Sequence, residues 1–168
     1  MQILVVDDEL PIAEILAAAC AQGGHSVAIR TSSTEALDYM QSHQVDVLVT
    51  DIVMPPPDGF YLIRESRKRN LRLVALAVTG HSVQEVLDEV IESGASDLIS
   101  KPVRLAEFRV RIALAVERRR TLDALLDRHR QLQLANSEKV AQLERELEEA
   151  RRLAQGPRPN LSLLAPTA

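Results

Sequence analysis

The sequence contains a single cysteine, and this scarcity excludes one common way of stabilising a small chain. Cys20 has no second cysteine to pair with, so an internal disulfide bond cannot form. Long apolar runs are also missing: none approaches the roughly 18 residues of a membrane-spanning helix. Met1 leads directly into an apolar strand pattern, without the basic segment of a secretion signal. These absences predict a cytoplasmic protein without a membrane span.

An excess of basic charge is missing as well. The 20 Lys and Arg residues are outnumbered by 24 Asp and Glu residues, which gives a formal net charge of -4 at pH 7. Because contacts to phosphates dominate nucleic-acid affinity, this balance disfavours binding through bulk charge, and we expect no nucleic acid among the partners. The length of 168 residues, with 46% hydrophobic residues, suffices for one ordinary globular domain plus a long element.

Short runs rich in Val, Leu and Ile alternate with segments of helical periodicity up to residue 118. This order is typical of a parallel sheet whose strands are joined by crossover helices. The predicted strands are residues 2–6, 26–30, 47–50, 73–77 and 97–99. The predicted helices are residues 11–22, 34–42, 59–69, 83–93 and one that begins near Val103. The sequence therefore predicts an α/β fold of the (βα)5 type, with a doubly wound, five-stranded parallel sheet over residues 1–118.

A long helix follows, because no Gly or Pro interrupts residues 103–155. A heptad counted from Leu105 places apolar residues at eleven of its fifteen a and d positions, which is typical of a coiled coil. The a positions are Leu105, Ile112, Arg119, Leu126, Gln133, Val140, Leu147 and Ala154, and the d positions are Phe108, Ala115, Leu122, His129, Asn136, Leu143 and Ala150. We expect the earlier part to pack on the sheet and residues 119–155 to form a coiled coil continuous with the last helix of the domain. Residues 156–168 contain three prolines and no helical period, which predicts a flexible tail.

The charges beside this seam distinguish a dimer from a single amphipathic helix that folds back on the domain. In a parallel dimer each g position faces the next e position of the partner. This arrangement brings Lys139 to Glu144 and Glu146 to Arg151, and both pairs have opposite charges. The sequence therefore favours a parallel homodimer.

The residues that close the predicted strands are polar. Asp7 and Asp8 follow the first strand, Asp51 the third, Thr79 the fourth and Lys101 the fifth. Ligand sites of open parallel sheets lie beyond the carboxyl ends of the strands, so we expect these side chains to converge. Three converging carboxylates would repel one another unless a cation lay among them, and oxygen ligands select a hard ion such as Mg²⁺. A hydroxyl and an ammonium would complement a tetrahedral anion on one carboxylate, as in phosphoryl transfer to an aspartate.

Each of these residues has a simpler interpretation when taken alone. Asp7 and Asp8 could cap the following helix, since acidic side chains favour helix N-termini. Asp51 could be a turn residue, and Lys101 a solvated surface lysine. Only their joint placement at successive strand ends favours the functional interpretation.

Four motifs around these positions occur in the order ILVVDDE, LVTDIVMPPPDG, AVTGH and SKP. Together they resemble the receiver domain of two-component response regulators, over residues 1 to about 118. The resemblance implies that Asp51 accepts a phosphoryl group from a histidine kinase or a phosphotransfer protein. It implies further that Asp8, Asp51 and the backbone carbonyl of Val53 bind Mg²⁺ directly, whereas Asp7 acts through a water.

The resemblance also implies roles for Lys101 and Thr79. Lys101 would pair with Asp51 in the resting state and with a phosphoryl oxygen afterwards, and its bond to Pro102 is typically cis. Thr79 would hydrogen-bond another phosphoryl oxygen. One departure concerns the readout: the switch aromatic of the family is here Leu98, so rotation of a Tyr or Phe ring cannot report phosphorylation.

These features predict a phosphorylation-responsive signalling protein that is not an enzyme. Its output would be its dimeric helix, which acts on an unidentified downstream protein through protein contacts, without a DNA-binding domain. Two alternatives stay open. The chain could be the receiver and linker of a longer enzyme such as a cyclase, phosphatase or kinase. It could also be a phosphohydrolase of the haloacid dehalogenase type, although that class has Asp-x-Asp whereas the pair here is adjacent.

Overall fold

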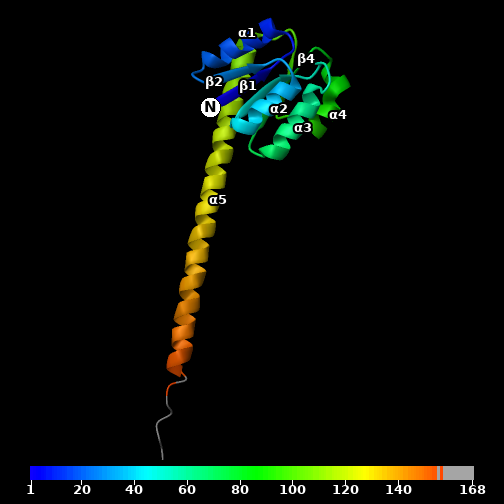
Figure 1. The fold of residues 1–168 in the computed structure, drawn as a ribbon. Coiled ribbons are helices and arrows are strands. Elements are labelled where there is room, and N and C mark those ends of the chain that lie inside the picture. Colours follow the sequence, from blue (N-terminus) through cyan, green and yellow to red (C-terminus); the bar gives the residue numbers. More distant parts are fainter. Residues whose placement is uncertain (155, 157–168) are drawn as a thin grey trace, which may run out of the picture. The chain divides into compact units, whose positions relative to one another are not determined.

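A computed structural model describes residues 1–154 and 156, which contain five strands that alternate with five helices (Figure 1). The strands are β1 (Gln2–Val6), β2 (Ser26–Arg30), β3 (Val47–Asp51), β4 (Val74–Thr79) and β5 (Asp97–Ser100). The helices are α1 (Leu10–Ala21), α2 (Ser33–Ser42), α3 (Gly59–Arg69), α4 (Val83–Ser93) and α5 (Leu105–Ala154). The chain divides into two compact units, Met1–Ala124 and Leu125–Ala168.

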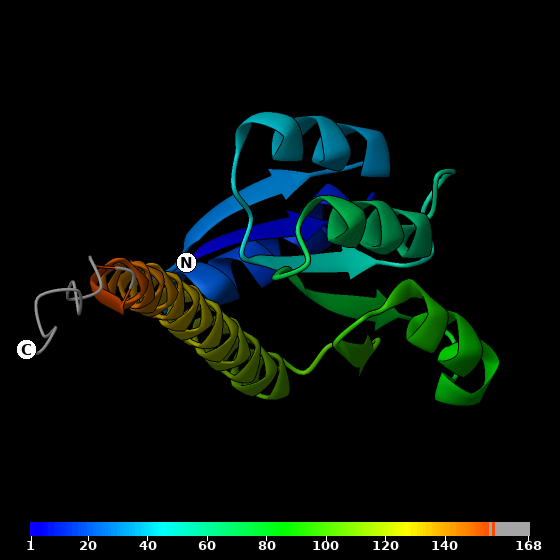
Figure 2. The same ribbon diagram turned by 90° about the horizontal axis from the view of Figure 1, so that it is seen from below.

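The strands of the first unit form one parallel sheet in the order β2-β1-β3-β4-β5. In the centre, Leu4 of β1 lies opposite Ala28 of β2 and Leu48 of β3. Helices α2, α3 and α4 lie on one side of this sheet, and α1 with the first turns of α5 lies on the other (Figure 2). The predicted (βα)5 fold with a five-stranded parallel sheet is confirmed.

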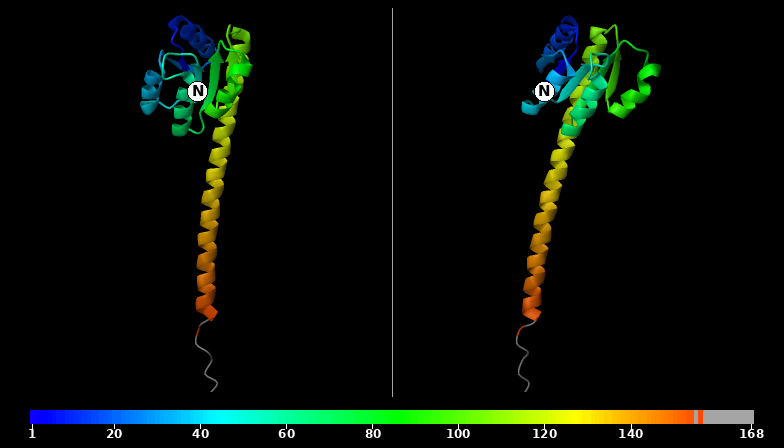
Figure 3. Two further views of the ribbon diagram at one scale, coloured as in Figure 1. Left: turned by 90° about the vertical axis from the view of Figure 1, so that its right-hand side faces the viewer. Right: turned by 45° about the vertical axis from the view of Figure 1, so that its right-hand side comes forward.

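Each face of the sheet has its own apolar core. Ile3 and Val5 of β1 belong to the core beneath α1 and α5, which lie side by side (Figure 3). Leu4 and Val6 belong to the core beneath α2, α3 and α4. Because both faces are covered, every position of β3 and β4 and all of β1 except Gln2 is buried, which explains the near-continuous apolar runs in the sequence.

Polar side chains define where three of the helices begin. Asp58 Oδ1 accepts a hydrogen bond from the amide of Tyr61 at 2.7 Å at the start of α3. Ser32 caps α2 in the same way, and Ser82 forms a capping box with Glu85 at the start of α4. These caps satisfy amide groups that have no partner inside the helix, and they fix the loops at the carboxyl edge of the sheet.

The predicted bounds differ from the observed ones mainly at two elements. The fourth strand was expected to end at residue 77, and β4 continues to Thr79 because it still pairs there with Ser100 of β5. The last helix was expected to begin near Val103, and α5 begins at Leu105. The first difference matters for the site, because it makes Thr79 the last residue of a buried strand.

The first turns of α5 pack on the sheet and belong to the first unit. The buried residues of this helix are Phe108, Ile112, Ala115, Val116 and Arg119. Leu122 is half-buried and packs against the same core. The compact unit consequently ends at Ala124, beyond the residue 118 expected as the end of the globular domain.

Residues 125–154 of α5 are all exposed. Polar contacts there join neighbours on the same helix, such as Gln142 Nε2 and Glu146 Oε1 at 2.8 Å. Several large apolar side chains are exposed too, among them Val140, Leu143 and Leu147. The predicted flexible tail, residues 156–168, lies outside the described residues except for Gly156. Within the described chain, no helix is both long and apolar enough to cross a membrane.

Candidate functional site

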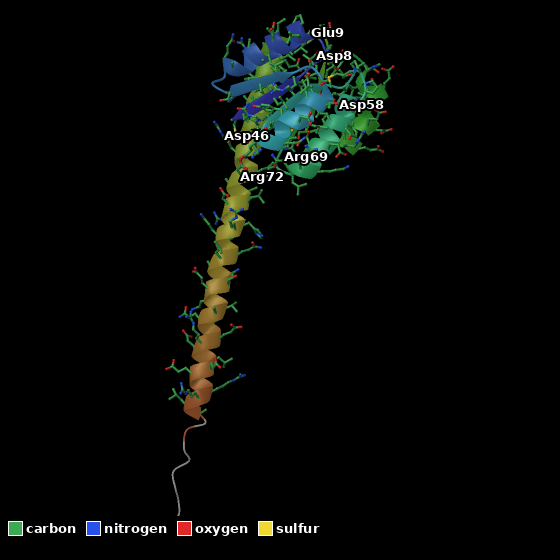
Figure 4. All side chains as sticks on the ribbon, in the orientation of Figure 1. Asp8, Glu9, Asp46, Asp58, Arg69 and Arg72 are labelled. Atoms are coloured by element: carbon green, nitrogen blue, oxygen red, sulfur yellow. The ribbon has the colours of Figure 1, made fainter. Side chains whose placement is uncertain are left out.

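Three aspartates meet at the carboxyl ends of β1 and β3. Asp51 is the last residue of β3, and Asp7 and Asp8 directly follow β1. Each offers one carboxylate oxygen, and these oxygens lie within 4.8 Å of one another. Asp7 and Asp51 are buried whereas Asp8 is exposed, and Figure 4 places Asp8 at the end of the unit away from Asp46. The cluster is therefore accessible to solvent on the side of Asp8.

Lys101 reaches this cluster from the loop that follows β5. Its Nζ lies 2.5 Å from Asp51 Oδ2 and 3.2 Å from Asp7 Oδ2. Burial by itself lowers the pKa of Lys101, but the hydrogen bonds and charges of Asp51 and Asp7 outweigh burial, so that the pKa is raised. The peptide bond between Lys101 and Pro102 is cis. Lys101 is thus a cation held between the two buried carboxylates.

Asp7 is the most enclosed of the three aspartates, with a side chain that is 1% exposed. Burial raises the pKa of Asp7, and its bonds to the Glu9 amide and to Lys101 only partly oppose that rise. The Glu9 amide donates to Asp7 Oδ1 at 3.0 Å, and Glu9 is the residue that precedes α1. Asp7 therefore both satisfies a backbone donor at the start of a helix and belongs to the acidic cluster, so the two interpretations are compatible.

The backbone around Asp51 is closely packed. The amide of Val53 donates to Asp51 Oδ1 at 2.9 Å, and the hydroxyl of Thr50 donates to the Asp51 carbonyl at 2.8 Å. Gly59 lies against the same carbonyl: a Cβ atom at residue 59 would come within 2.0 Å of the Asp51 oxygen. Only glycine permits this approach. The loop after β3 is therefore folded back onto Asp51.

Val53 contacts the cluster through its backbone, while its side chain is exposed. The contact that the structure provides is the amide hydrogen bond to Asp51. The predicted role of the Val53 carbonyl as a metal ligand stays a prediction.

Thr79 is fully buried at the end of β4. Its Oγ1 accepts a hydrogen bond from the amide of His81 at 2.9 Å, and its carbonyl accepts one from the amide of Lys101 at 2.6 Å. The second bond ties Thr79 to the residue whose ammonium pairs with Asp51. Among the described contacts, the Thr79 hydroxyl makes no hydrogen bond to the aspartates.

Leu98 occupies the position where the sequence comparison expected an aromatic ring. It lies in β5 opposite Ala77, half-buried, and packs against the core beneath α2, α3 and α4. Its aliphatic side chain has no polar atom that could bond to Thr79, so this position can respond to the site only through packing.

A groove adjoins the cluster on the side of α4, and sequence reasoning missed it. It has a volume of about 550 Å³, and Val53 and His81 are among its lining residues. The groove is also lined by the apolar residues Ile52, Phe60 and Val86 and by the acidic residues Asp58, Glu85 and Glu89. These residues come from the loop after β3, from α3 and from α4, so no local sequence pattern could have indicated the groove.

Comparison with known proteins gives a consistent result. Residues 3–113 match the family model described as the response regulator receiver domain. The probable transcriptional regulator ycf27 of Cyanidium caldarium is 33% identical over 127 residues, which are 74% of this chain and 49% of that protein. Response regulator MprA of Mycobacterium avium is 32% identical over 123 residues, which are 73% of this chain and 54% of that protein. The chain thus spans about half the length of these curated relatives.

Solved structures agree with the family match. A response regulator receiver domain protein from Clostridium thermocellum superposes with a TM-score of 0.66 at 29% identity, over 72% of this chain and 98% of that chain. NtrX from Brucella abortus gives a TM-score of 0.70 at 26% identity, over 75% of this chain and 29% of that chain. By the matched residues, the identities and the shared fold, the chain belongs to the response regulator receiver domain family.

Proposed function

We propose that this protein is a two-component response regulator in which Asp51 accepts a phosphoryl group from a histidine kinase or a phosphotransfer protein. The observation that carries the proposal is the 2.5 Å ion pair between Lys101 Nζ and Asp51 Oδ2 inside a cluster of three carboxylates. Asp51 is nearly buried, yet it adjoins the exposed Asp8. An acceptor for a group delivered by another protein needs this combination of fixed geometry and access from one side.

The charges of the cluster support a divalent cation as cofactor. Three carboxylates and one ammonium leave two negative charges that no described side chain of the cluster neutralises. The donors are oxygens only, which suits Mg²⁺, an ion that uses one or two carboxylates and keeps several waters. Asp8 and Asp51 would hold it directly with the Val53 carbonyl, and Asp7 through a water. When bound, Mg²⁺ would screen the negative charge of the incoming phosphoryl group.

The side chains around Asp51 have separate tasks in the transfer. A bond forms between a carboxylate oxygen of Asp51 and phosphorus, while the bond from phosphorus to the histidine nitrogen of the donor breaks. Lys101 is already placed to exchange its bond with Asp51 for one with a phosphoryl oxygen. Thr79 would donate its hydroxyl to a second phosphoryl oxygen, since the oxygen now only accepts from His81.

The output in this proposal is a parallel homodimer that acts on a downstream protein by contact. It would form through the exposed residues 125–154 of the predicted coiled-coil segment, residues 119–155. The exposed apolar side chains Val140, Leu143 and Leu147 support it, since a lone helix gains nothing by exposing a regular apolar stripe. The protein would not be an enzyme beyond assisting its own phosphorylation and dephosphorylation.

A second candidate is the receiver and linker part of a longer regulator. It is favoured by the curated relatives, transcriptional regulators among them, of which this chain spans about half. The chain covers 29% of NtrX in the same way. Reading the gene beyond the codon for Ala168 decides between the two candidates.

Phosphorylation of Asp51 is tested by incubating the protein with Mg²⁺ and a small-molecule phosphodonor, followed by intact-mass spectrometry. The native chain should gain one phosphoryl group, and Asp51→Asn should gain none. Asp58→Asn is the matched control, because Asp58 is an aspartate of the same loop that caps α3 and takes no part in the cluster. Equal labelling of the native chain and Asp51→Asn would refute the assignment.

A further inference from the structure

The first apolar residues of the heptad counted from Leu105 already pack inside the first unit. Phe108, Ile112, Ala115 and Arg119 are buried, and Leu122 packs against the core beneath α1 and α5. These five residues follow the heptad because they face the sheet. A dimer seam that begins after Leu122 therefore need not continue the heptad positions that these contacts with the sheet define.

Continued beyond Leu122, that frame selects an unfavourable seam. Before it reaches Val140 it passes through Leu126, His129, Gln133 and Asn136. Burying Gln133 removes its amide from water and immobilises a long, flexible side chain, and both effects cost free energy. The adjacent Leu132 is 54% exposed in the described chain and would stay outside the seam.

A seam through Leu125 and Leu132 removes this conflict. From Leu125 it steps to His129 and Leu132 with the usual spacings of four and three residues. Two successive steps of four then lead to Asn136 and Val140, after which the normal spacing resumes through Leu143, Leu147, Ala150 and Ala154. Two steps of four amount to an insertion of four residues into the heptad pattern, a stutter that locally unwinds the left-handed supercoil.

The stutter also changes the position of Asn136. In the frame counted from Leu105 it is a d residue. Counted from Leu132 it takes an a position, while its step of four to Val140 still has the spacing of a d residue. An Asn at a single a position specifies register in parallel coiled coils, because the two amides can bond to each other across the seam. The same residue that weakens the uninterrupted heptad thereby gains a defined role.

We propose that α5 beyond Leu122 binds a second copy of this chain through a seam with one stutter, in which Leu132 replaces Gln133. The inference rests on the homodimer proposed above. The charges beside the distal seam support a second copy in parallel orientation, because Lys139 would face Glu144 and Glu146 would face Arg151 of the other copy. The seam consists of Leu125, His129, Leu132, Asn136, Val140, Leu143, Leu147, Ala150 and Ala154.

Symmetric cysteine cross-linking of the full chain tests the seam. In a Cys20→Ala background, Leu132→Cys and Gln133→Cys are oxidised and the fraction of disulfide-linked dimer is measured on non-reducing gels. Leu132→Cys should cross-link about tenfold faster than Gln133→Cys, because only residues that face the partner bring two thiols within bonding distance. Val140→Cys, on the seam in both frames, is the positive control.

A second measurement does not depend on cysteine chemistry. Leu132→Ala should raise the dimer dissociation constant by about tenfold or more in sedimentation equilibrium, since it removes a buried leucine from each copy. Leu134→Ala is the matched control, because Leu134 has 60% exposure and lies on neither seam. It should leave the dissociation constant unchanged.

The outcomes separate this inference from the proposal it rests on. Faster cross-linking of Gln133→Cys, or equal effects of Leu132→Ala and Leu134→Ala in a chain that dimerises, would overturn the stutter and leave the homodimer intact. A native chain that stays monomeric at micromolar concentration, with no cross-linking of Val140→Cys, would overturn both.

Discussion

Arg119 Nη2 lies 3.1 Å from Asp46 Oδ1, and the Arg119 side chain is 1% exposed. Its Nε also lies 2.9 Å from Asp123 Oδ2, and Asp123 in turn pairs with Arg72. Asp46 precedes β3, so this pair joins α5 to the amino edge of the sheet, opposite the acidic cluster. Figure 4 shows Asp46 and Arg72 near each other at that edge. The helix is therefore fixed by a buried charge immediately before the first unit ends.

Removing this guanidinium should destabilise the first unit. Arg119→Met leaves Asp46 partly buried without its cation, and we expect a loss of about 3 kcal/mol in the free energy of unfolding. Urea denaturation followed by circular dichroism measures it. Arg120→Met is the control, because Arg120 is largely exposed and its nearest described acidic partner is 3.8 Å away. Similar losses in the two variants would show that the pair contributes little.

The acidic cluster predicts a strong dependence of metal affinity on Asp8. Asp8→Ala should weaken Mg²⁺ binding by about tenfold or more, because it removes one of the three carboxylates of the cluster. The fold should be retained, because Asp8 is exposed. Isothermal titration calorimetry measures the affinity. Glu9→Ala removes a neighbouring carboxylate that is outside the cluster and should change the affinity little. Unchanged affinity in Asp8→Ala would require a different set of ligands.

Gly59 should be sensitive to the smallest possible substitution. In Gly59→Ala the new methyl group would meet the Asp51 carbonyl at 2.0 Å, and a backbone atom cannot move aside without disturbing β3. We expect a loss of about 1–3 kcal/mol in the free energy of unfolding, measured in urea. A Cβ atom at Gly80 would meet nothing within 4 Å, so Gly80→Ala provides the comparison. Equal stability of the two variants would contradict the close packing.

Cys20 should react only when the chain unfolds. Burial raises the pKa of the Cys20 thiol to about 12, and the thiolate is the reactive form. At pH 8 the folded protein should therefore react very slowly with a chromogenic disulfide reagent, and the rate should rise with pH toward the raised pKa. In concentrated urea the same thiol should react at the rate of an ordinary cysteine. Rapid reaction of the folded chain at pH 8 would show that Cys20 is accessible.

The sequence predicted that the acidic side chains and Lys101 converge, because these residues stand at strand ends. The apolar runs before Asp7, Asp51 and Lys101 identify strands, and parallel strands necessarily bring their carboxyl ends to one edge of the sheet. The contact of Gly59 with the Asp51 carbonyl depends on how a loop folds back, which no periodicity encodes. Only the structure could provide that contact.

Arg119 shows the opposite case, in which the contact has no signal in the sequence. It occupies an a position of the heptad counted from Leu105, yet its side chain is buried in the first unit. Its burial depends on Asp46, which is distant in sequence, and on Asp123, one turn further along α5. A pairing between distant segments has no local signal, so it could not be predicted.

The oligomeric state should depend on the distal helix and not on the acceptor site. Leu143 is 51% exposed in the single chain and lies on the proposed seam whether or not the seam contains a stutter. Leu143→Asp would place two like charges in a buried layer, which should raise the dimer dissociation constant by about 100-fold or more. Sedimentation at micromolar concentration measures it, with and without prior phosphorylation of Asp51.

The native chain should sediment as a dimer in both states, because the distal seam is made of α5 residues outside the unit that contains Asp51. Leu134→Asp, which adds the same charge away from the seam, should remain a dimer. Phosphoryl labelling of Leu143→Asp should equal that of the native chain, since this variant leaves the acidic cluster around Asp51 unaltered. A native chain that is monomeric before phosphorylation and dimeric afterwards would instead place the dimer contact on the receiver unit.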